Sequence, residues 1–144
     1  MIQQDTVRLL RECSSGVQMG AASIENVLDS VQSGSLKKSL ADCKDKHLAL
    51  DRKISELLNR YGDDEKSPNA MAKAMSKAKV TMKLAMNDSD ETIADLMTEG
   101  CNMGVKTLSR YLNQYKAADE QSKNITKDLI SLEETLAKDI RRFL

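Results

Sequence analysis

The sequence contains no tryptophan, and its only aromatic side chains are those of Tyr61, Tyr111, Tyr115 and Phe143. A surface on which nucleic-acid bases stack relies on several aromatic side chains, so this scarcity disfavours one. A net charge of one sign is also absent, because 22 basic residues balance 22 acidic residues. Nucleic-acid binding through phosphates depends on excess positive charge. Both absences argue against nucleic acid as a partner.

Long apolar runs are missing as well. No stretch approaches the roughly 18 apolar residues of a membrane-spanning helix, and the N-terminal residues lack the order of a signal peptide. The cysteines Cys13, Cys43 and Cys101 form no Cys-x-x-Cys pair, and a thiol on an apolar helix face behaves as a small hydrophobic group. We therefore expect a cytoplasmic protein in which residues 1–144 form one helical-bundle domain.

The clearest positive feature is an unbroken heptad repeat. Its members follow at alternating spacings of four and three residues, which places them on one face of a helix of about seven turns. They are Leu36, Leu40, Cys43, His47, Leu50, Ile54, Leu57 and Tyr61. The pattern predicts a helix over 36–61, with Ser35 as its N-cap and Gly62 just past its end. His47, the only histidine, therefore points inward.

Similar stripes predict helices over 4–32 and 90–115, and a last helix that carries Ile125 to Phe143 after a turn within 117–122. Asp88 and Glu91 resemble a capping box before the helix that begins at residue 90. Ser67 and Pro68 are typical of a helix start and predict a further, short helix. No segment alternates as a strand does. The sequence thus predicts an all-α four-helix bundle, with the short helix in the crossover between the second and third long helices.

Glycines interrupt two of these stripes. Gly16 and Gly20 lie in the first predicted helix, and the stripe of the helix over 90–115 places Gly100 and Gly104 inward. Glycine is unfavourable inside a helix by about 1 kcal/mol relative to alanine. We interpret these positions as close helix crossings, or alternatively as the wall of a small-ligand pocket.

The order of elements, the spacing Leu-x-x-x-Cys-x-x-Gly from Leu9 to Gly16, the pair Ser35-Leu36 and the segment 93–111 together resemble small bacterial ferritin-like proteins. The resemblance implies a ferritin-like four-helix bundle. Such bundles commonly hold two iron or manganese ions with inward glutamates and two Glu-x-x-His motifs. Here Lys44 precedes His47 where that motif has glutamate, and the last predicted helix has no histidine. Most of the family's metal ligands are therefore missing.

Two interpretations of His47 follow. As a metal ligand it would act with Asp51, one turn later, and with Glu133, which flanks the last stripe. As a core residue it would instead hydrogen-bond with a carboxylate or a carbonyl group. Cys43 lies one turn before His47 on the same face, but burial of both disfavours a reactive thiolate. The interpretation as a core histidine is preferred.

The predicted short helix carries a methionine cluster and a lysine face. The methionines fit a copper(I) site or simple core packing. The lysines fit a solvated face, or docking on an anionic membrane or an acidic partner. These residues are Met71, Met75, Met82, Met86, Lys73, Lys77, Lys79 and Lys83.

Two classes of function remain. The first is a non-catalytic bundle that acts through protein association, as a homodimer or with another protein, using apolar residues just off the stripes such as Leu9, Val27 and Leu112. The second is an iron- or manganese-dependent oxidase or storage protein with a site at His47, Asp51 and Glu133. No nucleophile–base arrangement and no phosphate-binding loop occurs in the sequence.

Overall fold

The computed structural model describes residues 2–62 and 89–144. All regular secondary structure in these two ranges is helical. It consists of α1 (Ile2–Leu28), α2 (Gly34–Arg60), α4 (Asp90–Gln114) and α5 (Glu120–Ile140), followed by the short 3₁₀ helix η1 (Arg141–Phe143). The all-α prediction is confirmed for the described part of the chain. The predicted short helix, with its methionines and lysines, lies outside the described residues.

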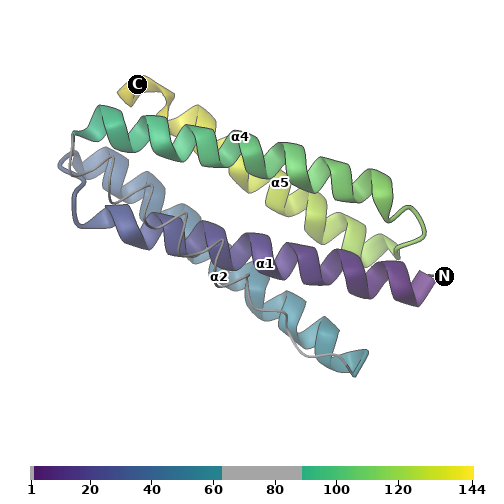
Figure 1. The fold of residues 1–144 in the computed structure, drawn as a ribbon. Coiled ribbons are helices and arrows are strands. Elements are labelled where there is room, and N and C mark those ends of the chain that lie inside the picture. The colour runs from purple at the N-terminus through teal and green to yellow at the C-terminus, as the bar shows by residue number, and fades with distance from the viewer. Residues whose placement is uncertain (1, 63–88) are drawn as a thin grey trace.

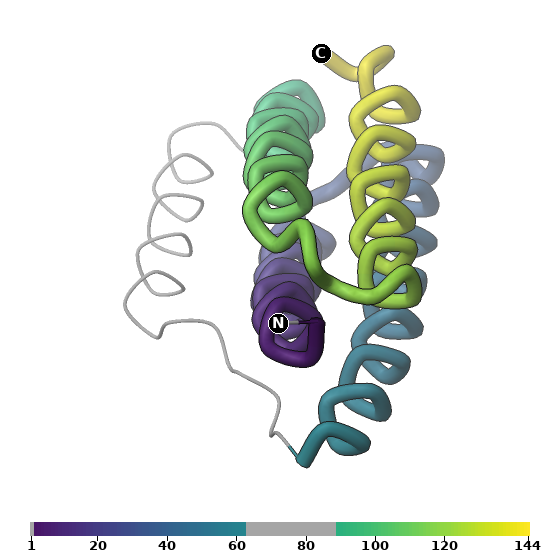
Figure 2. The backbone as a smooth tube through the Cα atoms, turned by 90° about the vertical axis from the view of Figure 1, so that its right-hand side faces the viewer, coloured from purple at the N-terminus to yellow at the C-terminus, as the bar shows by residue number. Residues whose placement is uncertain are grey.

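The four helices pack side by side as a bundle (Figure 1). α1 contacts α2, α4 and α5, and α5 also contacts α2 and α4. α4 begins beside the turn between α1 and α2. There the two carboxylate oxygens of Asp90 accept hydrogen bonds from the backbone N–H groups of Gln32 and Ser33, each at 2.9 Å. α2 and α4 therefore run in the same direction, and α1 and α5 run opposite to them (Figure 2).

The opposite end of the bundle is joined by similar contacts. Thr6 Oγ1 accepts a hydrogen bond from the backbone N–H of Asp119 at 2.8 Å, and Asp5 accepts one from the N–H of Ala117 at 3.1 Å. Tyr61, at the end of α2, donates its hydroxyl to the Asp119 carboxylate at 3.1 Å. The turn between α4 and α5 is thus held by residues of α1 and by the residue that follows α2.

Several predicted helix ends need correction. α1 ends at Leu28 rather than at Gln32, and Ser33 rather than Ser35 caps α2, accepting from Leu36 N at 3.3 Å. The N–H of Ser33 donates a hydrogen bond to the Asp90 carboxylate. This tertiary contact positions Ser33 and cannot be seen in the local sequence pattern. Ser89, not Asp88, is the N-cap of α4. Gly62 follows α2 with a φ of +70°, as the prediction of a helix-ending glycine requires.

Two apolar clusters form the interior, and each contains residues from all four long helices. One fills the end near the α1–α2 turn, with members such as Ile24, Leu40 and Met97. The other fills the opposite end, with members such as Leu10, Ile54 and Leu129. Leu9 and Val27 are completely buried in these clusters, so the prediction that they contribute to an apolar surface for a partner is wrong. Leu112 is half-buried.

Candidate functional site

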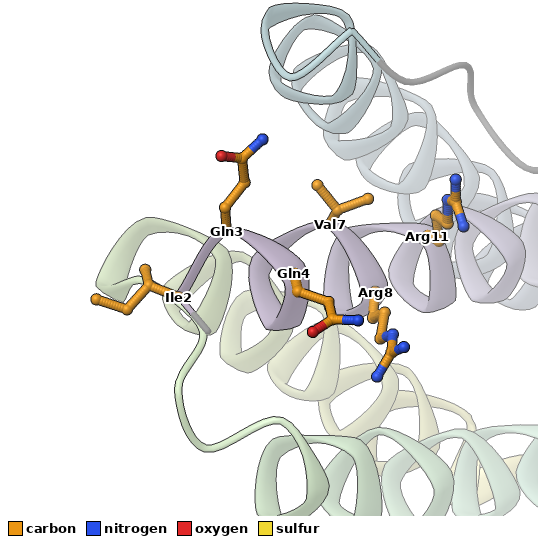
Figure 3. A pocket seen from close by; sticks show the side chains of 6 residues that line it. All are labelled: Ile2, Gln3, Gln4, Val7, Arg8 and Arg11. Carbon is orange, nitrogen blue, oxygen red and sulfur yellow. The ribbon is translucent and has the colours of Figure 1, made fainter.

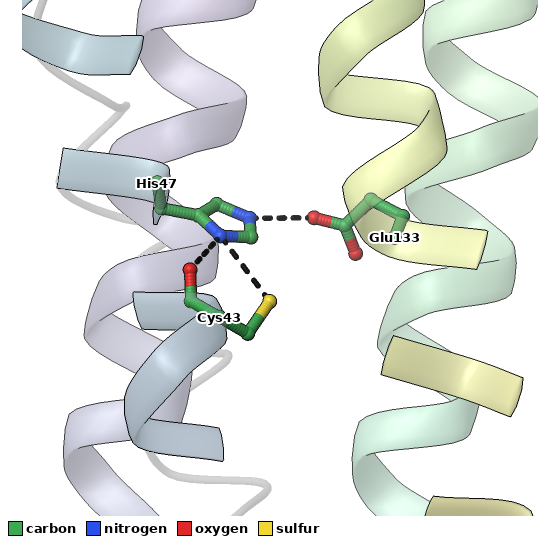
Figure 4. A network of polar contacts seen from close by, with 3 residues as sticks. All are labelled: Cys43, His47 and Glu133. Carbon is green, nitrogen blue, oxygen red and sulfur yellow. Dashed lines mark hydrogen bonds and ion pairs between the residues drawn. The ribbon is translucent and has the colours of Figure 1, made fainter. Parts of the chain in front are cut away.

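His47 lies at the level between the two apolar clusters, and only 1% of its surface is exposed. Its Nδ1 lies 2.8 Å from the carbonyl oxygen of Cys43, one turn earlier on α2. Its Nε2 lies 2.7 Å from Oε1 of Glu133, which reaches inward from α5 (Figure 4). The preferred interpretation, a core histidine bonded to a carboxylate and a carbonyl, therefore describes the geometry around this residue.

The backbone contact determines where the protons of the ring lie. A carbonyl oxygen only accepts hydrogen bonds, so Nδ1 of His47 carries a proton and donates it to Cys43 O. The short contact between Nε2 and Glu133 then requires a second proton, since a bare Nε2 facing a carboxylate would repel it. The two side chains consequently share one proton between Nε2 and Oε1.

The pKa of His47 agrees with this arrangement. Burial by itself lowers that pKa, but the side chains of Cys43 and Glu133, each through a hydrogen bond and through its charge, raise it more. The pKa rises from 6.5 to about 10, so at neutral pH the pair is an imidazolium with a carboxylate. Glu133 is 12% exposed, which makes this a largely buried ion pair.

Two cysteines complete the surroundings of the pair. Cys43 Sγ lies 3.5 Å from Nδ1 of His47, as their spacing on one helix face predicted. Cys101 of α4 is 3% exposed. Burial, together with the charge of Glu133 and a hydrogen bond to it, raises the pKa of the Cys101 thiol. This thiol is therefore a neutral donor to the carboxylate and a poor nucleophile.

The glycines Gly20 and Gly104 both lie beside the pair, but only Gly20 makes room for it. A Cβ placed on Gly20 would lie 2.9 Å from Nε2 of His47, closer than real Cβ atoms approach other atoms. A Cβ placed on Gly104 would lie 3.5 Å from the carboxyl carbon of Glu133, an ordinary contact. Gly100, predicted to point inward, is exposed instead, and a Cβ there would meet nothing within 4 Å. Cys101 takes the inward position. Residues three and four positions after Met97 both fit a heptad stripe, so the spacing alone does not distinguish Gly100 from Cys101.

The predicted metal set is brought together only in part. His47 and Glu133 meet, while Asp51 is half-buried one turn further along α2. Within 2–62 and 89–144, no group of three or more His, Cys, Asp or Glu side chains is arranged to hold a metal ion. The Cys43 thiol and the Glu133 carboxylate contact different nitrogens of the imidazole ring, Nδ1 and Nε2 (Figure 4).

An open pocket lies at the N-terminal end of α1 (Figure 3). The described residues that line it all belong to this helix: Ile2, Gln3, Gln4, Val7, Arg8 and Arg11. A typical enzyme pocket is concave and brings polar groups together from several elements. This lining provides no such convergence. None of the helices in the described ranges is long and apolar enough to cross a membrane.

Comparison of the chain with protein-family models, with curated proteins and with solved structures finds no match.

Sequence reasoning found His47, Cys43 and Glu133 but missed Cys101 and the separate roles of the glycines. Position 101 shares the heptad stripe of Met97 and Leu108, at spacings of four and seven residues, which was the available signal. The space beside Gly20 could not be assigned from the sequence, because the side chain that fills it belongs to another helix.

Proposed function

We propose that this protein is a non-catalytic, ferritin-like helical bundle that acts through protein association, as a homodimer. One observation carries the non-catalytic part. Both ring nitrogens of the only histidine already have partners inside the bundle, at 2.8 and 2.7 Å, and the ring is buried. A histidine held in this way is available neither to a substrate nor to a metal ion without breaking the ion pair.

The ferritin-like arrangement rests on the directions of the helices. α2 and α4 run in the same direction: α2 ends beside Asp119, and α4 begins at the other end of the bundle, beside the turn between α1 and α2. The chain order therefore requires a crossover between them. A four-helix bundle with one such long crossover is the ferritin-like topology. The neighbouring helices α1 and α2, and likewise α4 and α5, are antiparallel and joined by short turns.

Association is proposed because the polar groups that the described residues place at the centre of the bundle, those of His47, Glu133 and Cys43, are buried or largely buried and contact one another. This leaves the outer surface as the place of function. Sedimentation equilibrium over a range of protein concentrations tests the homodimer. We expect a mass of twice 16.0 kDa at micromolar concentration. A mass of 16.0 kDa at every concentration would contradict it, and binding to a different protein would then have to carry the proposal.

A metal-binding function with iron or manganese is the second candidate, and one observation favours it. His47 and Glu133 come from different helices and place a nitrogen and an oxygen 2.7 Å apart at the centre of the bundle. A cation that replaced the shared proton would be held by these two side chains, and Asp51 lies one turn away on α2.

Elemental analysis separates the two candidates. The protein is purified without chelator from cells supplied with iron and manganese, beside His47→Ala. Near-stoichiometric metal in the parent and its loss in the variant would establish the metal function. The non-catalytic proposal expects no stoichiometric metal in either protein.

A further inference from the structure

One residue from each long helix contributes to a layer between the two apolar clusters. We call Gly20, His47, Gly104 and Glu133 the central layer. Its members contact one another: His47 bonds with Glu133, Gly20 faces the imidazole and lies beside Oε1 of Glu133, and Gly104 faces the carboxylate. Two large polar side chains and two glycines thus fill the cross-section of the bundle at this level.

The central layer differs from the positions one heptad away on every helix. Those positions hold Cys13 and Val27 on α1, Leu40 and Ile54 on α2, Met97 and Tyr111 on α4, and Thr126 and Ile140 on α5. None of them is a glycine, and none is charged. Above and below the layer the core is built mainly of aliphatic side chains. One polar contact joins two of these flanking positions, the thiol–hydroxyl contact of Cys13 with Thr126 at 3.1 Å, and Thr126 has a second partner in the carbonyl oxygen of Ser122 on its own helix. Such cores tolerate exchange of one aliphatic residue for another.

The turns determine register only within each pair of consecutive helices. We call α1 with α2, and α4 with α5, the two hairpins. Residues 29–33 and 115–119 are short turns, so they prevent sliding inside a hairpin. Along the chain the hairpins are connected only through the long segment between α2 and α4. Across the bundle, hydrogen bonds at its two ends also join them: Asp90 bonds with the N–H groups of Gln32 and Ser33, and Asp119 bonds with Thr6 and Tyr61. Each hairpin contributes one glycine and one polar side chain to the central layer, and the His47–Glu133 bond joins them.

We propose that the central layer sets the register of one hairpin against the other. A slip of one heptad would keep aliphatic contacts at most core positions. It would also break the hydrogen bonds at the ends of the bundle, but these are exposed or part-buried, so water can replace the lost partners. It would bring His47 against Thr126 or Ile140, and Glu133 against Leu40 or Ile54. A buried imidazole and a buried carboxylate would then both lose their partner, which is far more costly than an exchange of aliphatic neighbours. A single buried polar pair can specify register in this way in helical assemblies.

The test removes the polar pair while the volume is kept. In His47→Leu/Glu133→Leu the layer becomes aliphatic, like its neighbours. Nitroxide labels at Lys37→Cys and Asp128→Cys, two exposed positions on different hairpins, report the register by double electron–electron resonance. The native thiols are buried and are protected from the label in the folded protein. A slip of one heptad displaces the labels along the bundle by about 10 Å.

We expect one label distance in the otherwise unchanged protein and at least two in His47→Leu/Glu133→Leu. A matched control, Lys46→Leu/Glu134→Leu, adds the same side chains at the neighbouring exposed positions and is expected to keep one distance. If the aliphatic variant keeps the single distance of the parent, the proposal is wrong.

A second variant decides the matter if the aliphatic one does not fold. In His47→Glu/Glu133→His the partners are exchanged, and each hairpin still has a glycine beside the pair. The proposal expects this variant to fold with a single label distance equal to that of the parent. Several distances, or failure to fold, would overturn it.

Discussion

Gly20 and His47 fit each other: the space that a Cβ would need at position 20 is occupied by the imidazole ring, whose Nε2 and Cδ2 would lie 2.9 and 3.0 Å from it. The ring has no freedom to move aside, since hydrogen bonds to Cys43 O and Glu133 Oε1 hold both of its nitrogens. A position that looks unfavourable for a helix is therefore required by a side chain of the neighbouring helix.

Gly20→Ala is expected to lower the free energy of unfolding by about 1–3 kcal/mol, because overpacking at the pinned ring outweighs the better helix propensity of alanine. Urea denaturation measures the change. Gly100→Ala is the control, since a Cβ there meets nothing within 4 Å. Its free energy of unfolding is expected to rise by up to about 1 kcal/mol. In a His47→Ala background the penalty of Gly20→Ala should disappear. Equal stability of the two single glycine variants would contradict the fit between Gly20 and His47.

Glu133→Leu is expected to destabilise the protein by about 3–5 kcal/mol, because it leaves a buried imidazole without the partner of its Nε2. The neighbouring exposed glutamate provides the control: Glu134→Leu should change stability by no more than about 0.5 kcal/mol. The same denaturation experiment measures both. A loss at position 133 as small as that at position 134 would show that the pair does not contribute to folding.

Stability should decrease with rising pH above neutrality. The pKa of His47 is raised from 6.5 to about 10, so the contribution of the pair is complete below pH 6.5 and is lost as the pH passes through 10. Between these values the folded protein holds a proton that the unfolded chain has released, and the free energy of unfolding falls by up to about 1.4 kcal/mol per pH unit.

Urea denaturation between about pH 6.5 and 8.5 measures this slope. This range ends below 9.0, where thiols of the unfolded chain ionise. His47→Leu/Glu133→Leu serves as the reference, because it lacks the titrating pair. The parent should lose stability across the range relative to the reference, and parallel curves would contradict the raised pKa.

Asp90→Ala is expected to lower the free energy of unfolding by about 1–3 kcal/mol, because the N–H groups of Gln32 and Ser33 both lose their acceptor. Asp90→Asn retains one acceptor oxygen and should cost less. Glu91→Ala, at an exposed position of the same helix turn, is the control. Amide hydrogen exchange at residues 32 and 33 should accelerate only in the Asp90 variants. Unchanged exchange there would exclude the contact.

The three thiols should react with a disulfide reagent only when the protein unfolds. Cys13, Cys43 and Cys101 are all buried. Burial raises the pKa of Cys13 to about 11, so little thiolate exists at neutral pH. The reaction rate in native buffer is expected to follow the fraction of open molecules and to rise with urea. Rapid labelling of one thiol in native buffer would show that its surroundings are accessible.

The sequence by itself determined the all-α class, the positions of the long helices and the inward direction of His47. These features depend on heptad spacing and on helix-ending residues such as Gly62, which act within one helix or at its end. It also indicated that His47 would bond with a carboxylate or a carbonyl group, because a buried polar ring needs partners.

Only the tertiary structure decided which groups meet. The choice of Glu133 as the partner of His47 depends on how α5 packs against α2, and the heptad stripes alone allow more than one register. Ser33 rather than Ser35 caps α2 because the chain turns toward Asp90, a residue far away in the sequence. Cys101 rather than Gly100 faces the interior because the rotation of α4 about its axis is determined by its neighbours. Local spacing determines which residues lie on one face of a helix, but the packing of the helices against one another determines which atoms come into contact.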